Sequence, residues 1–126
     1  MNFEYKIYND SNPPSIEDQK EALTRPRWSY LFALANIPGS DFKALQAKAC
    51  KNPYCAYLFA RDIAGANIKY CQEHACKDPI YAYYFAKYIP GADKKYCFKY
   101  VYPEERFGPD RWKSEYNKFI MQKACE

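Results

Sequence analysis

The chain has 126 residues and a net charge of +4, from 19 Lys and Arg against 15 Asp and Glu. This length fits one domain with a modest core, and the charge is well short of the strongly basic surface of a dedicated DNA-binding protein. No apolar run approaches the ~20 residues of a membrane-spanning helix, and residues 1–14 lack the basic and apolar regions of a secretory signal.

The first 14 residues predict an extended arm. Phe3, Tyr5 and Ile7 alternate with more polar residues, which is the pattern of a short strand. We expect this arm to pack on the rest of the chain, with pairing to a second chain as the alternative. Ser15 and Asp18 then resemble a capping box, which predicts a helix to about Leu23.

The centre of the chain repeats itself. Ala49–Cys71 and Ala75–Cys97 align at an offset of 26 residues without a gap, and 14 of the 23 aligned positions are identical. A weaker copy, Arg25–Cys50, has one extra residue before Ile37. A fixed period of this size is typical of a helical repeat array.

Each copy predicts two short helices. In the central copy Asn52 precedes Pro53, a strong signal for a helix start. Gly65 then offers a left-handed residue that can end this helix, and Asn67 is positioned to cap the second one. The first helix has an apolar face at helical spacing, formed by Ala56, Phe59, Ala60 and Ile63.

The C-terminal region departs from the repeat. Pro103 and Pro109 interrupt the pattern, and 110–125 predicts a final helix. One face of this helix is apolar and consists of Trp112, Tyr116, Phe119, Ile120 and Ala124. The sequence therefore predicts an all-α single domain, a small α-solenoid of about three 26-residue helix-turn-helix repeats over 15–102. The arm at 1–14 precedes it, and a capping helix at 103–126 closes it.

The second and third copies carry a recognisable motif. Residues 78–87, DPIYAYYFAK, resemble the D-P-x-Y-A-Y-x-[YF]-A-K helix-pair repeats of small, mostly uncharacterised proteins of bacteriophages and bacteria. The resemblance covers roughly residues 25–121. It implies an α-helical array and a phage or mobile-element origin, and by analogy a host-takeover or anti-defence role. It implies no activity for any single residue.

The six cysteines are expected to be small buried thiols in a cytoplasmic protein. Two alternatives remain open: a zinc site that uses Cys71, His74 and Cys76, or a disulfide such as Cys50–Cys55 or Cys71–Cys76. No nucleophile–base motif or phosphate-binding loop is present. We therefore expect a protein that is not an enzyme and uses neither a cofactor nor a metal.

Basic and aromatic residues recur at equivalent repeat positions. Lys43, Lys69 and Lys95 share one position, and Tyr70 and Tyr96 follow two of them. Such rows are able to contact phosphates and stack on bases, so nucleic-acid binding is one alternative function. Solvation of the helix surface is the simpler explanation of the lysines.

Aromatic residues make up 19% of the chain, and several lie off the predicted core face. Tyr and Arg are typical anchors of protein interfaces. We therefore expect a steric, protein-binding module, an inhibitor or modulator of a host protein, and leave its oligomeric state open. The predicted contact residues are Leu58, Arg61, Tyr84, Lys87 and Tyr88. A structural or self-assembling role is the third alternative.

Overall fold

The computed structural model describes residues 14–125. Within this range it contains one 3-10 helix, nine α-helices and no strand, which confirms the all-α prediction. The predicted strand around Phe3, Tyr5 and Ile7 lies outside the described residues. The elements are η1 (Ile16–Asp18), α2 (Gln19–Ala22), α3 (Pro26–Leu34), α4 (Phe42–Ala49), α5 (Pro53–Asp62), α6 (Ile68–Ala75), α7 (Pro79–Tyr88), α8 (Lys94–Val101), α9 (Glu104–Phe107) and α10 (Arg111–Cys125).

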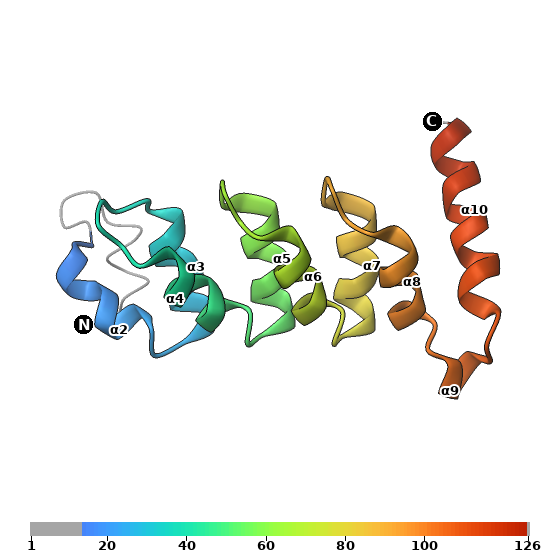
Figure 1. Cartoon of the computed structure of the whole chain (residues 1–126), viewed down its shortest axis with the longest axis horizontal. Helices are drawn as coiled ribbons and strands as arrows, with labels where there is room; N and C mark the ends of the chain where they lie inside the picture. The colour runs from blue at the N-terminus through green and yellow to red at the C-terminus, as the bar shows by residue number, and fades with distance from the viewer. Residues whose placement is uncertain (1–13, 126) are drawn as a thin grey trace.

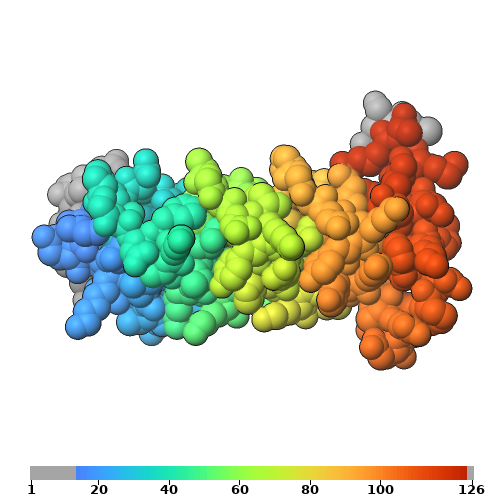
Figure 2. Space-filling view, in the orientation of Figure 1, coloured from blue at the N-terminus to red at the C-terminus, as the bar shows by residue number. Residues whose placement is uncertain are grey.

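The central helices form three antiparallel pairs in a row (Figure 1). The pairs are α3/α4, α5/α6 and α7/α8, and the first helix of each pair also packs on the first helix of the next. Helix α10 lies at the far end of the row and packs on α8. The space-filling view shows an elongated body, one pair following the next (Figure 2).

The predicted helix starts are confirmed. The Asn52 side chain accepts a hydrogen bond from the Cys55 backbone N–H at 3.1 Å, and Asp78 accepts one from Ile80 at 2.9 Å. In the second helix of the same pair Asn67 accepts one from Tyr70 at 3.0 Å. Each cap satisfies a backbone donor that the first helical turn leaves unpaired, so the repeated Asx residues fix where the helices begin.

The turn after α5 differs from the prediction. The helix ends at Asp62 because Ile63 turns into extended backbone and is itself buried. Gly65 is not the residue that ends the helix. It is the third residue of a turn closed by a hydrogen bond from Ala66 N–H to Ile63 O at 3.2 Å, and its φ of +82° suits a type II turn.

The extra residue of the first copy is accommodated beside its turn. Asn36 adopts a φ of +54°, a left-handed conformation that Asn tolerates better than most residues. The following turn, closed by Ser40 N–H to Ile37 O, keeps the geometry of the other copies. The insertion therefore changes one backbone conformation and leaves the helix pair intact.

The core is continuous from one pair to the next. Phe32, Phe59 and Phe85 occupy equivalent positions in α3, α5 and α7, and each side chain is fully buried. Buried glutamines add polar links between pairs. The Gln46 side chain accepts a hydrogen bond from the Asn67 backbone N–H at 2.8 Å, and the Gln72 side chain accepts one from Asp93 at 2.7 Å. These bonds fix the position of each pair relative to its neighbour.

Candidate interaction surfaces

A group of tyrosines covers the outer side of α5 and α7. We call Tyr54, Tyr57, Tyr81, Tyr84 and Tyr88 the tyrosine cluster. Each ring contacts at least one other, with centroids 5.3–6.4 Å apart. The Tyr54 ring lies 5.3 Å from that of Tyr81, and the Tyr84 ring lies 6.1 Å from that of Tyr88. Tyr57 is buried, but Tyr54, Tyr84 and Tyr88 are 42%, 40% and 52% exposed. The neighbouring Ile80 is 59% exposed, so the apolar surface extends past the rings.

Three of the predicted contact residues lie together at the tyrosine cluster. Tyr84, Lys87 and Tyr88 are exposed on α7. The Lys87 ammonium lies 5.4 Å from the Tyr88 ring centroid and 5.9 Å from that of Tyr83. A cation at this distance is attracted to the ring face. The surface therefore combines apolar rings with one positive charge.

Arg61 is exposed but already engaged. Its guanidinium contacts both carboxylate oxygens of Asp62 at 2.8 and 2.9 Å, and the Tyr30 hydroxyl donates a hydrogen bond to the same carboxylate. The hydrogen bond from Arg61 is the main cause that lowers the pKa of Asp62, and the bond from Tyr30 also lowers it, although burial acts in the opposite direction. Burial, and then the Asp62 bond, raise the pKa of Tyr30. This group joins α3 to α5, so a partner would meet Arg61 as part of an ion pair.

The prediction that Leu58 is a contact residue is wrong. We expected an exposed contact residue, but its side chain is only 6% exposed. The physical reason is its place in the row: α5 has α3 on one flank and α7 on the other, and both pack against it. The equivalent Tyr84 on α7 also packs toward the preceding pair, with its ring 6.0 Å from that of Tyr57 on α5, yet it stays 40% exposed. Leu58 therefore belongs to the core between pairs.

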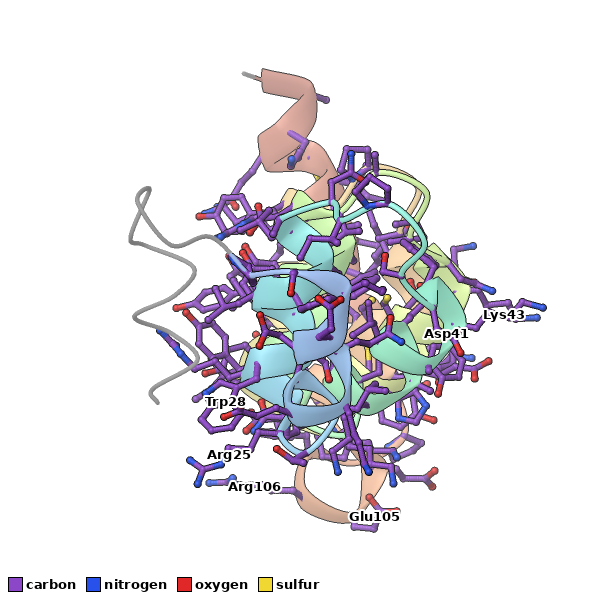
Figure 3. All side chains as sticks on the ribbon, turned by 90° about the vertical axis from the view of Figure 1, so that its left-hand side faces the viewer. Arg25, Trp28, Asp41, Lys43, Glu105 and Arg106 are labelled. Carbon is purple, nitrogen blue, oxygen red and sulfur yellow. The ribbon has the colours of Figure 1, made fainter. Side chains whose placement is uncertain are left out.

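The lysine row lies on the other flank of the molecule. Lys43, Lys69 and Lys95 each occupy the second residue of α4, α6 and α8, and all are exposed. Figure 3, viewed along the row, shows Lys43 pointing outward on one side. Trp28, at the repeat position that Tyr81 of the tyrosine cluster occupies on α7, lies on the opposite side. The two candidate surfaces are therefore distinct.

Tyr70 and Tyr96 are less available than the lysines beside them. The Tyr70 ring packs on His74 with centroids 4.6 Å apart, and the Tyr96 ring packs on Tyr100 at 5.0 Å. Both are half-buried, and burial is the main cause that raises the pKa of each hydroxyl. Burial, and then the Lys77 charge, lower the pKa of His74.

A groove between α8 and α10 was not predicted from the sequence. It is lined in part by Lys95, Trp112, Lys113, Tyr116 and Asn117. The ammonium groups of Lys99 and Lys113 lie 5.1 and 5.9 Å from the Trp112 ring centroid, and that of Lys95 lies 5.9 Å from the Tyr116 ring. No motif could have indicated it, because residues of two different helices form it only when α10 packs on α8.

The structure bears on both alternatives for the cysteines, the zinc site and the disulfide. Cys71 and Cys76 contact different thiols, Cys50 and Cys97 respectively, so their sulfurs lie in different interfaces. Within residues 14–125, no three His, Cys, Asp or Glu side chains are grouped as metal ligands would be. His74 instead lies near Lys77, with its Nδ1 3.3 Å from the ammonium.

Comparisons with family models, with curated proteins and with solved structures find no match to this chain. Among the described helices, none combines the length and the apolar character needed to span a membrane. The fold defines the class, an all-helical protein of packed helix pairs, and any function must be argued from its surfaces.

Proposed function

We propose that this chain is a short α-solenoid of three helix pairs that binds a protein partner through the tyrosine cluster, acting by steric block as an inhibitor or modulator of a host factor. The observation that carries the proposal is the connected set of exposed aromatic rings on α5 and α7. Large aromatic side chains that stay exposed on a folded protein mark interaction sites more often than plain solvated surface.

The chemistry of the cluster suits a protein interface. Tyrosine loses little conformational entropy on binding, because only two side-chain torsions are fixed, and it offers both a ring and a hydroxyl. Tyr54, Tyr84 and Tyr88 are pre-organised by contacts with neighbouring rings. Lys87 at the edge favours a partner with an apolar patch bordered by acidic residues.

The proposed host target follows from the resemblance of residues 78–87 to phage-type repeats and from the absence of a motif for catalysis. A steric mechanism needs only a firm docking surface, which a row of packed helix pairs provides. No residue of the chain identifies the target, so the experiment has to identify it.

The test is an affinity pulldown from bacterial lysate, with and without nuclease, comparing the native chain with Tyr84→Ala/Tyr88→Ala. Tyr100→Ala is the matched control, since Tyr100 is 44% exposed on α8, the second helix of its pair. We expect one protein complex that survives nuclease treatment, is lost with the double variant and is kept with the control. Retention by a double variant that is folded by circular dichroism would exclude the tyrosine cluster.

Nucleic-acid binding is the second candidate, and the groove between α8 and α10 is the observation that favours it. Three lysines beside Trp112 and Tyr116 combine phosphate-binding charge with stacking rings. Affinity for a single-stranded oligonucleotide should then fall steeply with salt, and Lys99→Ala should reduce that dependence. Binding that ignores salt, or no binding, would reject this candidate. Light scattering over a concentration series tests the remaining alternative of self-assembly.

A further inference from the structure

Four cysteines meet in two pairs at equivalent places in the fold. The sulfur of Cys50 lies 3.7 Å from that of Cys71, and Cys76 lies 3.7 Å from Cys97, each pair being 21 residues apart. In both pairs the first cysteine is the C-cap residue of one helix, and the second is the fourth residue of the next helix on the same flank. All four are at most 2% exposed.

Simple space filling does not account for this arrangement. The position equivalent to Cys71 in the first copy is Leu45, which is also buried, so an ordinary apolar residue fits there. If cysteine filled these positions only because of its size, we would expect an apolar residue opposite it at the α4–α6 or the α6–α8 contact. Both internal interfaces instead place a thiol on each side.

The end of the row supports the same reading. The residue equivalent to Cys50 and Cys76 at the end of α8 is Tyr102. Its ring packs on Phe98 and Phe107, with centroids 6.2 and 5.4 Å apart, and no further helix pair follows it. A cysteine is thus present at this C-cap position where a second thiol faces it and absent where none does.

We infer that Cys50–Cys71 and Cys76–Cys97 are two disulfide-forming sites that cross-link α4 to α6 and α6 to α8. A disulfide requires the sulfurs to approach from 3.7 Å to about 2.05 Å. In each reaction the two thiols give up two protons and two electrons. A disulfide oxidant accepts them and leaves as two thiols.

The environment of the first pair indicates which sulfur reacts first. The hydrogen bond from Cys50 lowers the pKa of Cys71, although burial acts in the opposite direction, and the same contact raises the pKa of Cys50. Cys71 is therefore the thiolate that attacks the oxidant and forms a mixed disulfide with half of it. The Cys50 thiolate then attacks the Cys71 sulfur of this mixed disulfide and releases that half as a thiol. Because both thiols are buried, the attack requires a local opening between the two pairs, and a small oxidant will react faster than a protein.

Each cross-link would hold two successive helix pairs together. It closes a loop of about 20 residues, and loops of that size raise the folding equilibrium constant by about 100-fold or more. The sites lie between α4, α6 and α8, so oxidation would fix the stacking of the row without covering the tyrosine cluster on α5 and α7. This inference does not depend on the proposed function.

The experiment compares the full chain under dithiothreitol with the same chain under oxidised glutathione. Peptide mapping without reduction identifies the bonds, and urea unfolding followed by circular dichroism measures their effect. Cys71→Ala removes the first pair only, and Cys97→Ala the second. Cys55→Ser is the matched control, because Cys55 is buried in α5 but belongs to neither pair. Comparing the two redox states within each variant cancels the cost of the substitution itself.

We expect peptides that join Cys50 to Cys71 and Cys76 to Cys97, with a folding equilibrium constant about 100-fold higher per bond than in the reduced chain. Each alanine variant should lose one bond and its share of the gain, whereas Cys55→Ser should keep both. The inference is overturned if the thiols stay reduced under conditions that oxidise the urea-unfolded chain. It is equally overturned if Cys50–Cys55 or Cys71–Cys76 predominates, or if oxidation lowers stability.

Discussion

Replacing Gln72 with alanine tests how consecutive helix pairs are held together. The Gln72 side chain is only 5% exposed, and its Oε1 accepts a hydrogen bond from the Asp93 backbone N–H at 2.7 Å. Deleting the acceptor leaves this partly buried donor without its partner, which costs about 1–3 kcal/mol. The lost methylene adds about 0.8 kcal/mol. We therefore expect Gln72→Ala to lower the free energy of unfolding by about 2–4 kcal/mol.

This loss is large compared with the about 5–15 kcal/mol that stabilises a typical domain. The assay is urea unfolding followed by circular dichroism, in which the midpoint should fall while the slope stays constant. A thermal scan should show a melting temperature lower by about 8–16 °C, at about 4 °C per kcal/mol for a chain of this size.

Two further glutamine variants make the test specific. Gln46→Ala should cost a similar amount, because Gln46 makes the equivalent bond to Asn67 at 2.8 Å. Gln122→Ala on the exposed surface of α10 should change stability by less than about 0.5 kcal/mol. If Gln72→Ala matches Gln122→Ala, the bond does not hold the pairs together and the reasoning fails.

Three other changes test separate parts of the fold. Gly65→Ala should cost about 1 kcal/mol in urea unfolding, from its φ of +82° alone, because no atom lies within 4 Å of the added methyl group; an unchanged midpoint would contradict the turn. Asp62 has a pKa below its ordinary 3.8, so its stabilisation is present above that pH and is lost as the pH falls through the lowered value. Asp62→Asn should flatten this part of the stability profile, and an acid limb parallel to that of the native chain would refute the assignment. Phe98→Ala should cost about 3–5 kcal/mol and speed hydrogen exchange in α10, since Phe98 packs on Phe119 at 5.1 Å; slow exchange in α10 would show that other contacts hold it.

Much of the fold could be predicted because local chemistry dictates it. Asx caps followed by proline fix the starts of α5 and α7, and the 3.6-residue spacing identifies the buried faces. The role of Gly65 was predicted less well. A glycine after an apolar run suits either a left-handed helix end or a β-turn, and the sequence does not say that Ile63 is buried in extended backbone.

The candidate site shows where sequence patterns stop being informative. Leu58 and Tyr84 occupy equivalent positions, yet one is 6% exposed and the other 40%. A repeat pattern assigns both to the same helix face, whereas exposure also depends on the size of the side chain and on the residues of the neighbouring helices around it. The glutamine hydrogen bonds were not predicted for a related reason. A polar Gln is expected on the surface, and the sequence does not show that a backbone N–H of the next pair lies opposite it. Its recurrence at one repeat position, as Gln46 and Gln72, was the signal that could have revealed it.

The two ends of the row differ chemically from its middle. Gln19 in α2 accepts a hydrogen bond from the Asp41 backbone N–H at 2.6 Å, the same link that Gln46 and Gln72 make further along. Residues 19–23 therefore take the place of a shortened α4-type helix, and the first full pair, α3/α4, stacks against them. The short α2 supplies the bond that begins the series.

At the other end the equivalent of Gln72 is Phe98, which cannot accept a hydrogen bond from a further pair. Its ring instead packs on Tyr116 and Phe119 of α10, with centroids 5.8 and 5.1 Å apart. The last copy thus has Phe98 where the preceding copy has Gln72, and Tyr102 where it has Cys76. These two aromatic residues replace the side chains that contact a following helix pair. Helix α10 also contacts α7, since the Phe119 ring packs on Tyr83 with centroids 6.4 Å apart and Lys123 donates a hydrogen bond to the Lys87 backbone O at 3.3 Å. The substitutions that end the stacking therefore build the contact with α10, whereas the exposed ring of Tyr84 lies at the contact between α5 and α7, inside the row.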